Sequence, residues 1–200
     1  MRWIGGDWGR EEVTAYNLRG DGNEFTIFAD SQMARVSRAR RLITASLPFM
    51  DTNKIIELGC SAGDISGPFA RQHGNVVFGY DLVPGAVRAA RQRYPDMIVK
   101  QKAVEDVGVA DCDVLVLTEI LEHVMEPLQL VAAWGPQART MVIGHPLVGD
   151  GEDDERGHLW AYTLEDFQSW FAIAGHDLIE SETFDLGPYR MVIGRGVRRG

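Results

Sequence analysis

Residues 54–65 of this chain read Lys-Ile-Ile-Glu-Leu-Gly-Cys-Ser-Ala-Gly-Asp-Ile. The apolar run before the first glycine is short and mostly β-branched, which is typical of a parallel strand that is buried on both faces. Gly59 and Gly63 have no Cβ, so they allow a sharp turn and a close approach of a ligand. We expect a helix at 64–73 whose free N–H groups point to the same space. This order of elements predicts the first unit of a nucleotide-binding α/β fold.

The charge of the turn argues against a dinucleotide. The pattern G-x-G-x-x-G is not met, because Ser61 and Asp64 occupy positions where that pattern has glycine. The carboxylates of Glu57 and Asp64 would also lie near a pyrophosphate, which is unfavourable. The expected ligand therefore carries positive charge, as S-adenosylmethionine does through its ammonium and sulfonium groups. For this turn alone, a glycine turn that binds no ligand is the alternative.

A second motif follows at residues 75–82, where another short apolar strand ends in Asp81. This carboxylate comes 81 − 59 = 22 residues after Gly59. An acidic residue about 20 positions beyond such a turn is placed to accept hydrogen bonds from both ribose hydroxyls. A compatible second role is the N-cap of a helix predicted at Pro84–Arg93.

At these residues the sequence resembles the class I S-adenosylmethionine-dependent methyltransferases, whose first motif is an acidic residue, a hydrophobic residue and Gly-x-x-x-Gly. The resemblance covers about residues 50–197. It implies an α/β fold, a Rossmann-like three-layer sandwich with a mostly parallel seven-stranded sheet and a C-terminal antiparallel hairpin at about 177–184 and 189–197. The methyltransferase domain is expected at 50–200, preceded by an N-terminal arm and helix at 1–49 that cover the pocket.

The resemblance also implies the cofactor-binding residues. Those of the glycine turn contact the methionine part, Asp81 binds ribose, and the loop with Glu105 lies near adenine. The full predicted set is Glu57, Gly59, Cys60, Ser61, Ala62, Gly63, Asp81, Leu82, Val104, Glu105, Thr118 and Glu119.

Residues 119–124 read Glu-Ile-Leu-Glu-His-Val and follow an apolar strand predicted at 113–118. They are similar to the Glu-x-x-Glu-His-Val signature of a branch with ubiquinone-pathway O-methyltransferases and small-RNA 3′-end 2′-O-methyltransferases. In the RNA-methylating members four residues of the pattern hold a divalent ion. The resemblance thus implies a possible Mg²⁺, Mn²⁺ or Zn²⁺ site at Glu119, Glu122, His123 and His158.

Three histidines are candidates on the acceptor side. Without metal, His123 is a candidate general base, because its ordinary pKa lies near 6.5. The alternative for His123 is a helix-capping or core histidine. His145 is expected at the rim of the pocket, with an ordinary turn histidine before proline as its alternative, and His158 is the third candidate. Thr163 is predicted to cap a helix from Leu164 to Ala174, with Asp166 at the reciprocal position.

Outside these motifs the chain gives weaker signals. Residues 1–30 show no sustained period and predict an irregular arm. An amphipathic helix is expected from Ser31 to Pro48, with Met33, Val36, Ile43 and Leu47 on one face. Its run Arg38–Arg41 either grips an anionic substrate or forms a solvated charged face. The acidic stretch 149–157 is predicted to be a mobile solvated loop.

The composition sets further limits. The 200 residues, 45% of them hydrophobic, are enough for one domain with a core. No apolar run is long enough to span a membrane and no signal peptide is recognised, so we expect a cytoplasmic protein without a membrane partner. The two cysteines indicate neither a disulfide framework nor a zinc site. A net charge of −9 disfavours nucleic acid as a partner without excluding it.

The sequence therefore predicts transfer of a methyl group to an oxygen or nitrogen atom of a small-molecule acceptor. Three alternatives stay open: a metal-dependent RNA 3′-end 2′-O-methyltransferase, a nucleotide-dependent oxidoreductase and a cofactor-binding module without activity.

Overall fold

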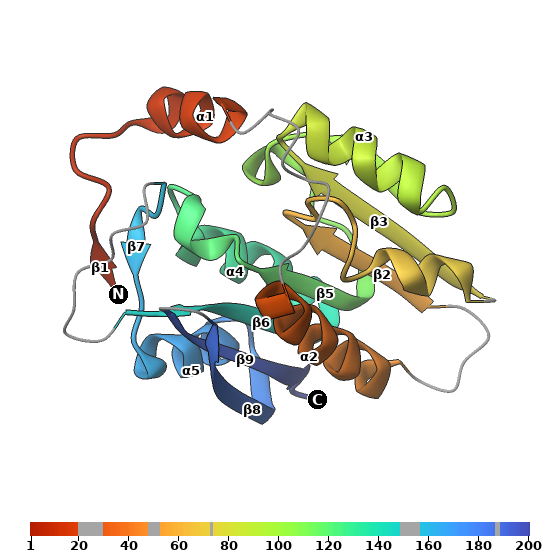
Figure 1. Cartoon of the computed structure of the whole chain (residues 1–200). Coiled ribbons are helices and arrows are strands. Elements are labelled where there is room, and N and C mark those ends of the chain that lie inside the picture. The colour runs from red at the N-terminus through yellow and green to blue at the C-terminus, as the bar shows by residue number, and fades with distance from the viewer. Residues whose placement is uncertain (20–29, 48–52, 73, 149–156, 187–188) are drawn as a thin grey trace.

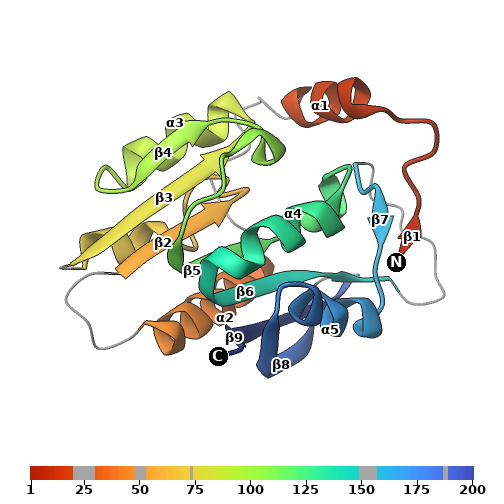
Figure 2. The ribbon, with the colours of Figure 1, turned by 180° about the vertical axis from the view of Figure 1, so that it is seen from behind.

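The computed structural model describes residues 1–19, 30–47, 53–72, 74–148, 157–186 and 189–200. Within these residues a seven-stranded sheet forms the middle layer of a three-layer α/β sandwich, as predicted (Figures 1 and 2). Its order is β4-β3-β2-β5-β6-β9-β8. The first five strands in this order run parallel, and β9 pairs antiparallel with both β6 and β8. The strands are β2 (Asn53–Leu58), β3 (Asn75–Asp81), β4 (Ile98–Gln101), β5 (Cys112–Thr118), β6 (Ala138–Leu147), β8 (His176–Leu186) and β9 (Tyr189–Arg198).

The central strands are apolar on both faces because helices cover both faces. Val114 and Val116 of β5 join the core beneath α2 (Asp30–Ser46) and α3 (Pro84–Arg93). Leu115 and Leu117 alternate with them and join the core beneath α4 (Pro127–Trp134) and α5 (Leu164–Ile173). All four side chains are buried, and the two views show the helices on opposite sides of the sheet (Figures 1 and 2). The alternation follows from the period of two in a strand.

The strand order reverses between β2 and β5. From β2 the chain moves outward to β3 and β4, and it then returns to add β5 and β6 on the other side of β2. Neighbouring connections therefore diverge at the carboxyl ends of β2 and β5, which opens a crevice between the loops. Gly59 directly follows β2 and Glu119 directly follows β5, so both predicted motifs meet at this crevice.

The amphipathic helix after Ser31 is confirmed as α2, with a change in its buried face. Val36 and Ile43 are fully buried, whereas Met33 is 44% exposed and does not belong to that face. The arginines at 38, 40 and 41 make ion pairs and hydrogen bonds within the protein, and Arg41 is exposed. Arg41 pairs with Glu180 at 2.8 Å and Glu182 at 2.9 Å, so it joins α2 to the edge strand β8.

The N-terminal residues are more regular than predicted. Residues Arg2–Trp3 form β1, which pairs antiparallel with β7 (Trp160–Ala161) in a separate two-stranded sheet, and Arg10–Arg19 form α1. The prediction of an irregular arm is wrong for these residues. The helix escaped prediction because its sequence lacks an apolar stripe; Val13 is buried, but Leu18 is 37% exposed. Residues 20–29 of the expected arm and 149–156 of the expected acidic loop lie outside the described residues.

The expected α-helix at 64–73 is also wrong. Turns follow Gly63, and then only the short 3₁₀ helix η2 (Gly67–Arg71) forms. Pro68 cannot donate a backbone hydrogen bond, and a Cβ at Gly67 would lie 2.4 Å from the ring of Tyr94. Free N–H groups near the turn are satisfied differently, since the N–H of Ser66 donates to Glu57 Oε2 at 3.2 Å.

No helix in the described part of the chain has the length and hydropathy that a membrane crossing requires.

Candidate active site

The glycine turn after β2 has an unusual backbone. Gly59, Ser61 and Gly63 have φ values of +76°, +45° and +80°. A Cβ at Gly59 would lie 2.8 Å from Ile120 Cδ1, so this position needs glycine both for its conformation and for space. Ser61 adopts a left-handed conformation that is uncommon for a residue with a side chain, and such conformations often occur where a loop binds a ligand.

Asp81 holds this turn against the end of β3. Its Oδ2 accepts a hydrogen bond from the N–H of Ser61 at 2.7 Å, and its Oδ1 accepts one from the N–H of Val83 at 2.9 Å. Burial raises the pKa of Asp81, while these backbone hydrogen bonds favour its charged form. The N-cap of α3 is Val83 and no side chain caps it, so the predicted capping role of Asp81 is wrong.

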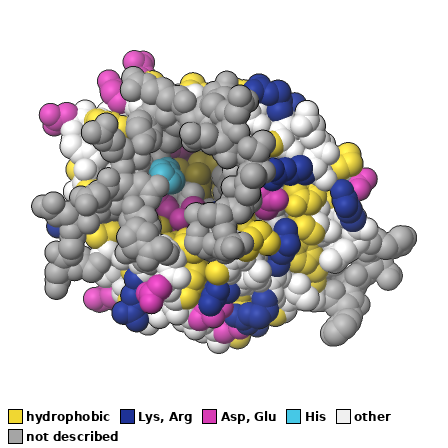
Figure 3. Space-filling view, in the orientation of Figure 1, with side chains coloured by type: hydrophobic (Ala, Val, Ile, Leu, Met, Phe, Trp, Pro, Cys, Tyr) yellow, Lys and Arg dark blue, Asp and Glu magenta, His cyan; other side chains and the backbone are white. Residues whose placement is uncertain are grey.

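The cleft has two sides that share Gly59, Ser61, Glu119 and His123, and Figure 3 shows a hollow with a histidine and acidic side chains inside. The β3 side is further lined by Arg10, Val13, Thr14, Asp81, Leu82, Val83, Ala103, Val104, Glu105, Ile120, Val124 and Met125. The α2 side is further lined by Arg35, Val36, Glu57, Cys60, Asp64, Ile65 and Thr118.

The cleft contains all the predicted cofactor residues except Ala62 and Gly63. Ala62 is buried, and Gly63 faces the side chains of Tyr94 and Met97. The residues that do line the cleft come from the ends of β2, β3 and β5 and from the short helix η3 (Val104–Asp106) after β4. Because parallel strands end at the same edge of the sheet, residues from distant parts of the sequence meet there.

Both helices before the first core strand contribute cleft residues that the sequence did not indicate. Arg10, Val13 and Thr14 reach the β3 side from α1, and Arg10 pairs with Asp106 at 2.6 Å. Arg35 reaches the α2 side from α2. Nothing near Arg35 in the sequence shows that it faces a cleft.

The carboxyl groups on the α2 side differ in their surroundings. Burial raises the pKa of Glu57 to about 8, so its carboxyl group is mostly protonated at neutral pH. Asp64 accepts hydrogen bonds from Arg93 at 3.1 Å and from the hydroxyl of Tyr94 at 3.0 Å. Burial also raises the pKa of Cys60, so this residue lines the pocket as a neutral thiol.

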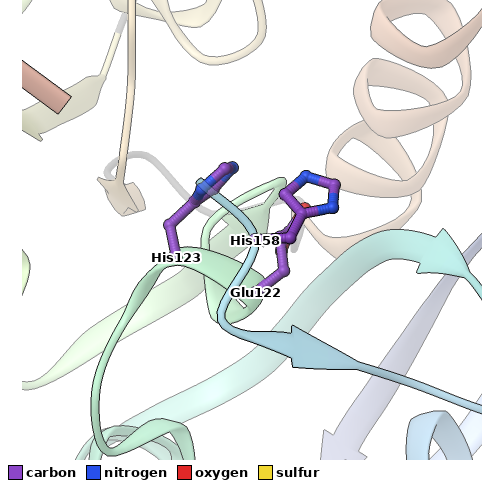
Figure 4. A group of neighbouring side chains, drawn as sticks. All are labelled: Glu122, His123 and His158. Carbon is purple, nitrogen blue, oxygen red and sulfur yellow. The ribbon is translucent and has the colours of Figure 1, made fainter. Parts of the chain in front are cut away.

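Glu122, His123 and His158 form a compact group (Figure 4), and His123 is its member that lines the cleft. One potential ligand atom from each lies within 4.8 Å of those of the others, and the two imidazole rings are 4.9 Å apart. Glu122 and His158 are buried, whereas His123 is partly exposed. Glu119, the fourth predicted ligand, does not belong to this group and instead faces Arg35 at 3.7 Å.

The segment before and within β7 fixes this group in place. The N–H of Leu159 donates to the Glu122 carbonyl at 2.7 Å, and the indole of Trp160 donates to the Val124 carbonyl at 3.0 Å. Nδ1 of His123 lies 2.9 Å from the carbonyl oxygen of Gly157. Since a carbonyl only accepts, Nδ1 carries a proton in this contact, and Nε2 has the lone pair when the ring is neutral.

His145 does not lie at the rim of the pocket. Strand β6 continues through it, and its side chain is fully buried among Tyr162, Phe167 and Trp170. Its Nδ1 donates to the Pro146 carbonyl at 2.9 Å, and its Nε2 accepts from the indole of Trp170 at 3.3 Å. Both contacts fit a neutral ring, and burial lowers the pKa to about 4. The prediction that His145 faces an acceptor is wrong; it is a core histidine.

Part of the chain is similar in sequence to known methyltransferases. Residues 56–135 match the family described as "Methyltransferase domain". The chain is 32% identical over 99 residues to the ubiquinone biosynthesis O-methyltransferase of Cereibacter sphaeroides (strain ATCC 17025 / ATH 2.4.3). The aligned region covers 46% of this chain. The chain spans only 39% of that relative's length.

Solved structures match most of the chain at low identity. Magnesium protoporphyrin IX methyltransferase from Synechocystis PCC 6803, with bound SAH, aligns with a TM-score of 0.70 at 15% identity, over 93% of each chain. The [4+2]-cyclase SpnF aligns with a TM-score of 0.66 at 13% identity, over 88% of this chain and 85% of that one. Residues 56–135 are thus similar to the methyltransferase-domain family. The chain has the class I S-adenosylmethionine-dependent methyltransferase fold, which confirms the resemblance seen in the sequence.

Proposed function

We propose that this chain transfers the methyl group of S-adenosylmethionine to an oxygen or nitrogen atom of a small-molecule acceptor. The observation that carries the proposal is the position of Asp81, at the end of β3 and bonded to the left-handed glycine turn, on the wall of the cleft. When bound, S-adenosylmethionine supplies an already activated methyl group on a sulfonium. The protein then contributes mainly alignment of the acceptor and exclusion of water.

The β3 side suits the adenosine part of this donor. The Asp81 carboxylate can accept hydrogen bonds from both ribose hydroxyls, a role that an acidic residue after the second strand commonly has. Leu82, Val83 and Val104 provide apolar surface for the adenine ring, and Glu105 lies at the same side. Helix α1 adds Val13 to this surface, so the adenine would be covered from outside the core.

His123 is the proposed acceptor-side base. It lines both sides of the cleft, so it lies where the donor and the acceptor would meet. Its Nδ1 proton is directed to Gly157, which leaves Nε2 as the atom that can take a proton from an acceptor hydroxyl or amine. His158, next to it, is proposed to position this ring rather than to react.

A metal-dependent form of the same reaction is the second candidate, and the grouping of Glu122, His123 and His158 favours it. Two imidazoles and one carboxylate fit Zn²⁺ or Mn²⁺ better than Mg²⁺, which prefers oxygen ligands. A bound ion would polarise an acceptor oxygen. The contact of His123 Nδ1 with a carbonyl also directs Nε2 toward ligation, as in many metal sites.

Calorimetry with S-adenosylhomocysteine tests the proposal most directly. The wild-type protein should bind this product, and Asp81→Asn should weaken binding by roughly 10- to 100-fold because one charged acceptor is lost. Leu82→Ala is the matched control on the same wall and should have a smaller effect. A wild-type protein without affinity for this ligand would refute the proposal.

Elemental analysis of the purified protein separates the two candidates. If the metal-dependent form is correct, the purified protein should contain about one equivalent of zinc or manganese. His158→Gln should lose that metal, and a chelator should abolish methyl transfer by the wild-type protein. A metal-free protein whose methyl transfer resists the chelator, yet falls in His123→Ala, would leave only the base mechanism.

A further inference from the structure

Asp64 ends the glycine turn and is held from two directions. Its backbone oxygen accepts hydrogen bonds from Nε of Arg40 at 2.8 Å and from Nη2 of the same side chain. Its carboxylate accepts from Nη1 of Arg93 at 3.1 Å and from the hydroxyl of Tyr94 at 3.0 Å. Arg40 lies on α2, whereas Arg93 is the last residue of α3 and Tyr94 is its C-cap. One residue of the turn thus connects two helices that lie far apart in the sequence.

The turn lacks the support that an α-helix would give it. In a nucleotide-binding βα unit a helix directly follows the glycine turn and packs on the strand. Here the described residues after Gly63 form turns and then the short η2. The left-handed Ser61 lies just before this stretch, and a residue with a side chain keeps such a conformation only where surrounding contacts hold it. The turn therefore depends on contacts from other elements of the fold.

Two sets of contacts hold the turn. Asp81, at the end of β3, accepts from the N–H of Ser61 at 2.7 Å. Further along the turn the ring of Tyr94 lies against the backbone, since a Cβ at Gly63 would be 3.1 Å from this ring. The hydroxyl of the same ring bonds to Asp64. Asp81 therefore fixes the middle of the turn, while Tyr94 and the other partners of Asp64 fix its end.

The side chains that hold Asp64 do not line the cleft. Arg40, Arg93 and Tyr94 are absent from the described residues on either side of it, whereas Asp64 lines the α2 side. Any effect of these three side chains on a bound ligand therefore passes through the turn.

We infer that Arg40, Arg93 and Tyr94 are positioning residues, which act through Asp64 to keep the glycine turn in the conformation that binds the donor. The inference rests on the proposed function and adds to it residues outside the cleft. Without these bonds the turn adopts other conformations as well, and the measured affinity falls with the fraction of molecules in the competent one. Side chains from α2 and α3 thus pre-organise the site in the ligand-free protein.

A pair of arginine variants isolates this role. Arg40→Met removes the two bonds to the turn and keeps a helix-forming side chain. Arg91→Met is the matched control, because Arg91 donates from Nε at 3.1 Å and from Nη2 at 2.8 Å to the backbone oxygen of Val99, outside the cleft. Each variant loses one guanidinium and its bonds to one carbonyl, and only the carbonyl of Asp64 belongs to the turn. Calorimetry with S-adenosylhomocysteine measures the affinity, and thermal unfolding without ligand measures the stability.

Arg40→Met should weaken the binding of S-adenosylhomocysteine roughly tenfold, since it removes charged donors from the turn. Arg91→Met should stay within about twofold of the wild-type affinity, because distant sites without shared partners act independently. Both variants should lower the melting temperature to a similar extent, so a purely structural role would not separate them. Arg40→Lys keeps a donor for the carbonyl and should regain part of the affinity.

Hydrogen exchange of the ligand-free protein reports on the turn itself. The amides of residues 59–66 should exchange faster in Arg40→Met than in wild type, and at the wild-type rate in Arg91→Met. Saturating S-adenosylhomocysteine should slow this exchange in Arg40→Met, because the ligand selects the competent conformation.

Tyr94→Phe decides the matter if Arg40→Met does not fold, because it keeps the ring against Gly63 and removes only the bond to Asp64. It should weaken S-adenosylhomocysteine roughly threefold and speed the same exchange. Wild-type affinity in the variants of Arg40 and Tyr94, or a loss in Arg91→Met as large as theirs, would overturn the positioning role while leaving the proposed function intact. A wild-type protein that does not bind S-adenosylhomocysteine would overturn the proposed function, and this inference with it.

Discussion

Glu57 makes the stability of the ligand-free protein depend on pH in an unusual direction. Burial in the central strand β2 raises its pKa from an ordinary value of 4.5 to about 8. Between these values the unfolded chain has lost the proton and the folded protein keeps it, so the free energy of unfolding falls as pH rises. The window is roughly 3.5 units wide and each unit is worth about 1.4 kcal/mol, so roughly 4 to 5 kcal/mol is lost across it.

Glu57→Gln should remove this loss. The amide is neutral at every pH and its oxygen can still accept the hydrogen bond from the N–H of Ser66. Near pH 4.5 the variant and wild type should have similar stability, and by pH 8 the variant should be more stable by about 4 kcal/mol. The gain would reverse the usual expectation for a change in a central buried strand.

Urea unfolding at pH 5, 6, 7 and 8 without ligand measures the effect, with the slope against urea checked for constancy. Glu105→Gln is the control, because this carboxylate belongs to the same cleft but is exposed. It should follow the wild-type pH dependence. Parallel pH curves for wild type and Glu57→Gln would refute the reasoning, since they would mean that Glu57 is not protonated in the folded protein.

The remaining predictions concern the core and one helix end. Burial lowers the pKa of His145 to about 4, so the protein should lose about 3 kcal/mol of stability as pH falls from 6.5 to 4. His145→Gln should flatten the dependence of the melting temperature on pH in this range. Gly135→Ala places a Cβ 2.5 Å from the Cα of Ala174, so urea unfolding should show a loss of about 1 to 3 kcal/mol. Gly108→Ala, with open space around it, should stay within about 1 kcal/mol of wild type. Thr163→Ala removes one half of the capping box of α5 and should lower stability by about 1 kcal/mol, measured as a shift in melting temperature.

The parts of the fold that the sequence predicted are those with strong local signals. The runs that became β2, β3 and β5 are apolar on successive residues, which only a strand covered on both faces tolerates. The capping box at Thr163 and Asp166 is likewise local, and the structure has both of its hydrogen bonds. The meeting of the proposed cofactor residues in one cleft was predictable for a related reason, since a parallel sheet brings its carboxyl ends to one edge.

The errors fall where tertiary contacts decide. Nothing near His145 in the sequence shows that β6 continues past Gly144 and turns the imidazole toward Trp170. Helix α1 has no apolar stripe, so its place over the cleft depends on contacts such as Arg10 with Asp106. Arg35 looked like one of several surface arginines, and only the packing of α2 beside β5 and β6 shows that it points into the cleft.

The fold alone leaves the chemistry open, since proteins that align with this chain at similar TM-scores include a methyltransferase and a [4+2]-cyclase. The charges of the cleft discriminate further. On the α2 side the described lining contributes three carboxyl groups and one guanidinium, and the guanidinium already faces Glu119. A dinucleotide would bring its pyrophosphate to the turn beside Asp64, and the described residues that follow Gly63 form no α-helix whose N-terminus could offset the added negative charge. A sulfonium with an α-ammonium would instead bring positive charge to the carboxyl groups of Asp64 and Glu119. The charge pattern of the cleft therefore supports the adenosyl donor over a nicotinamide cofactor, independently of sequence likeness.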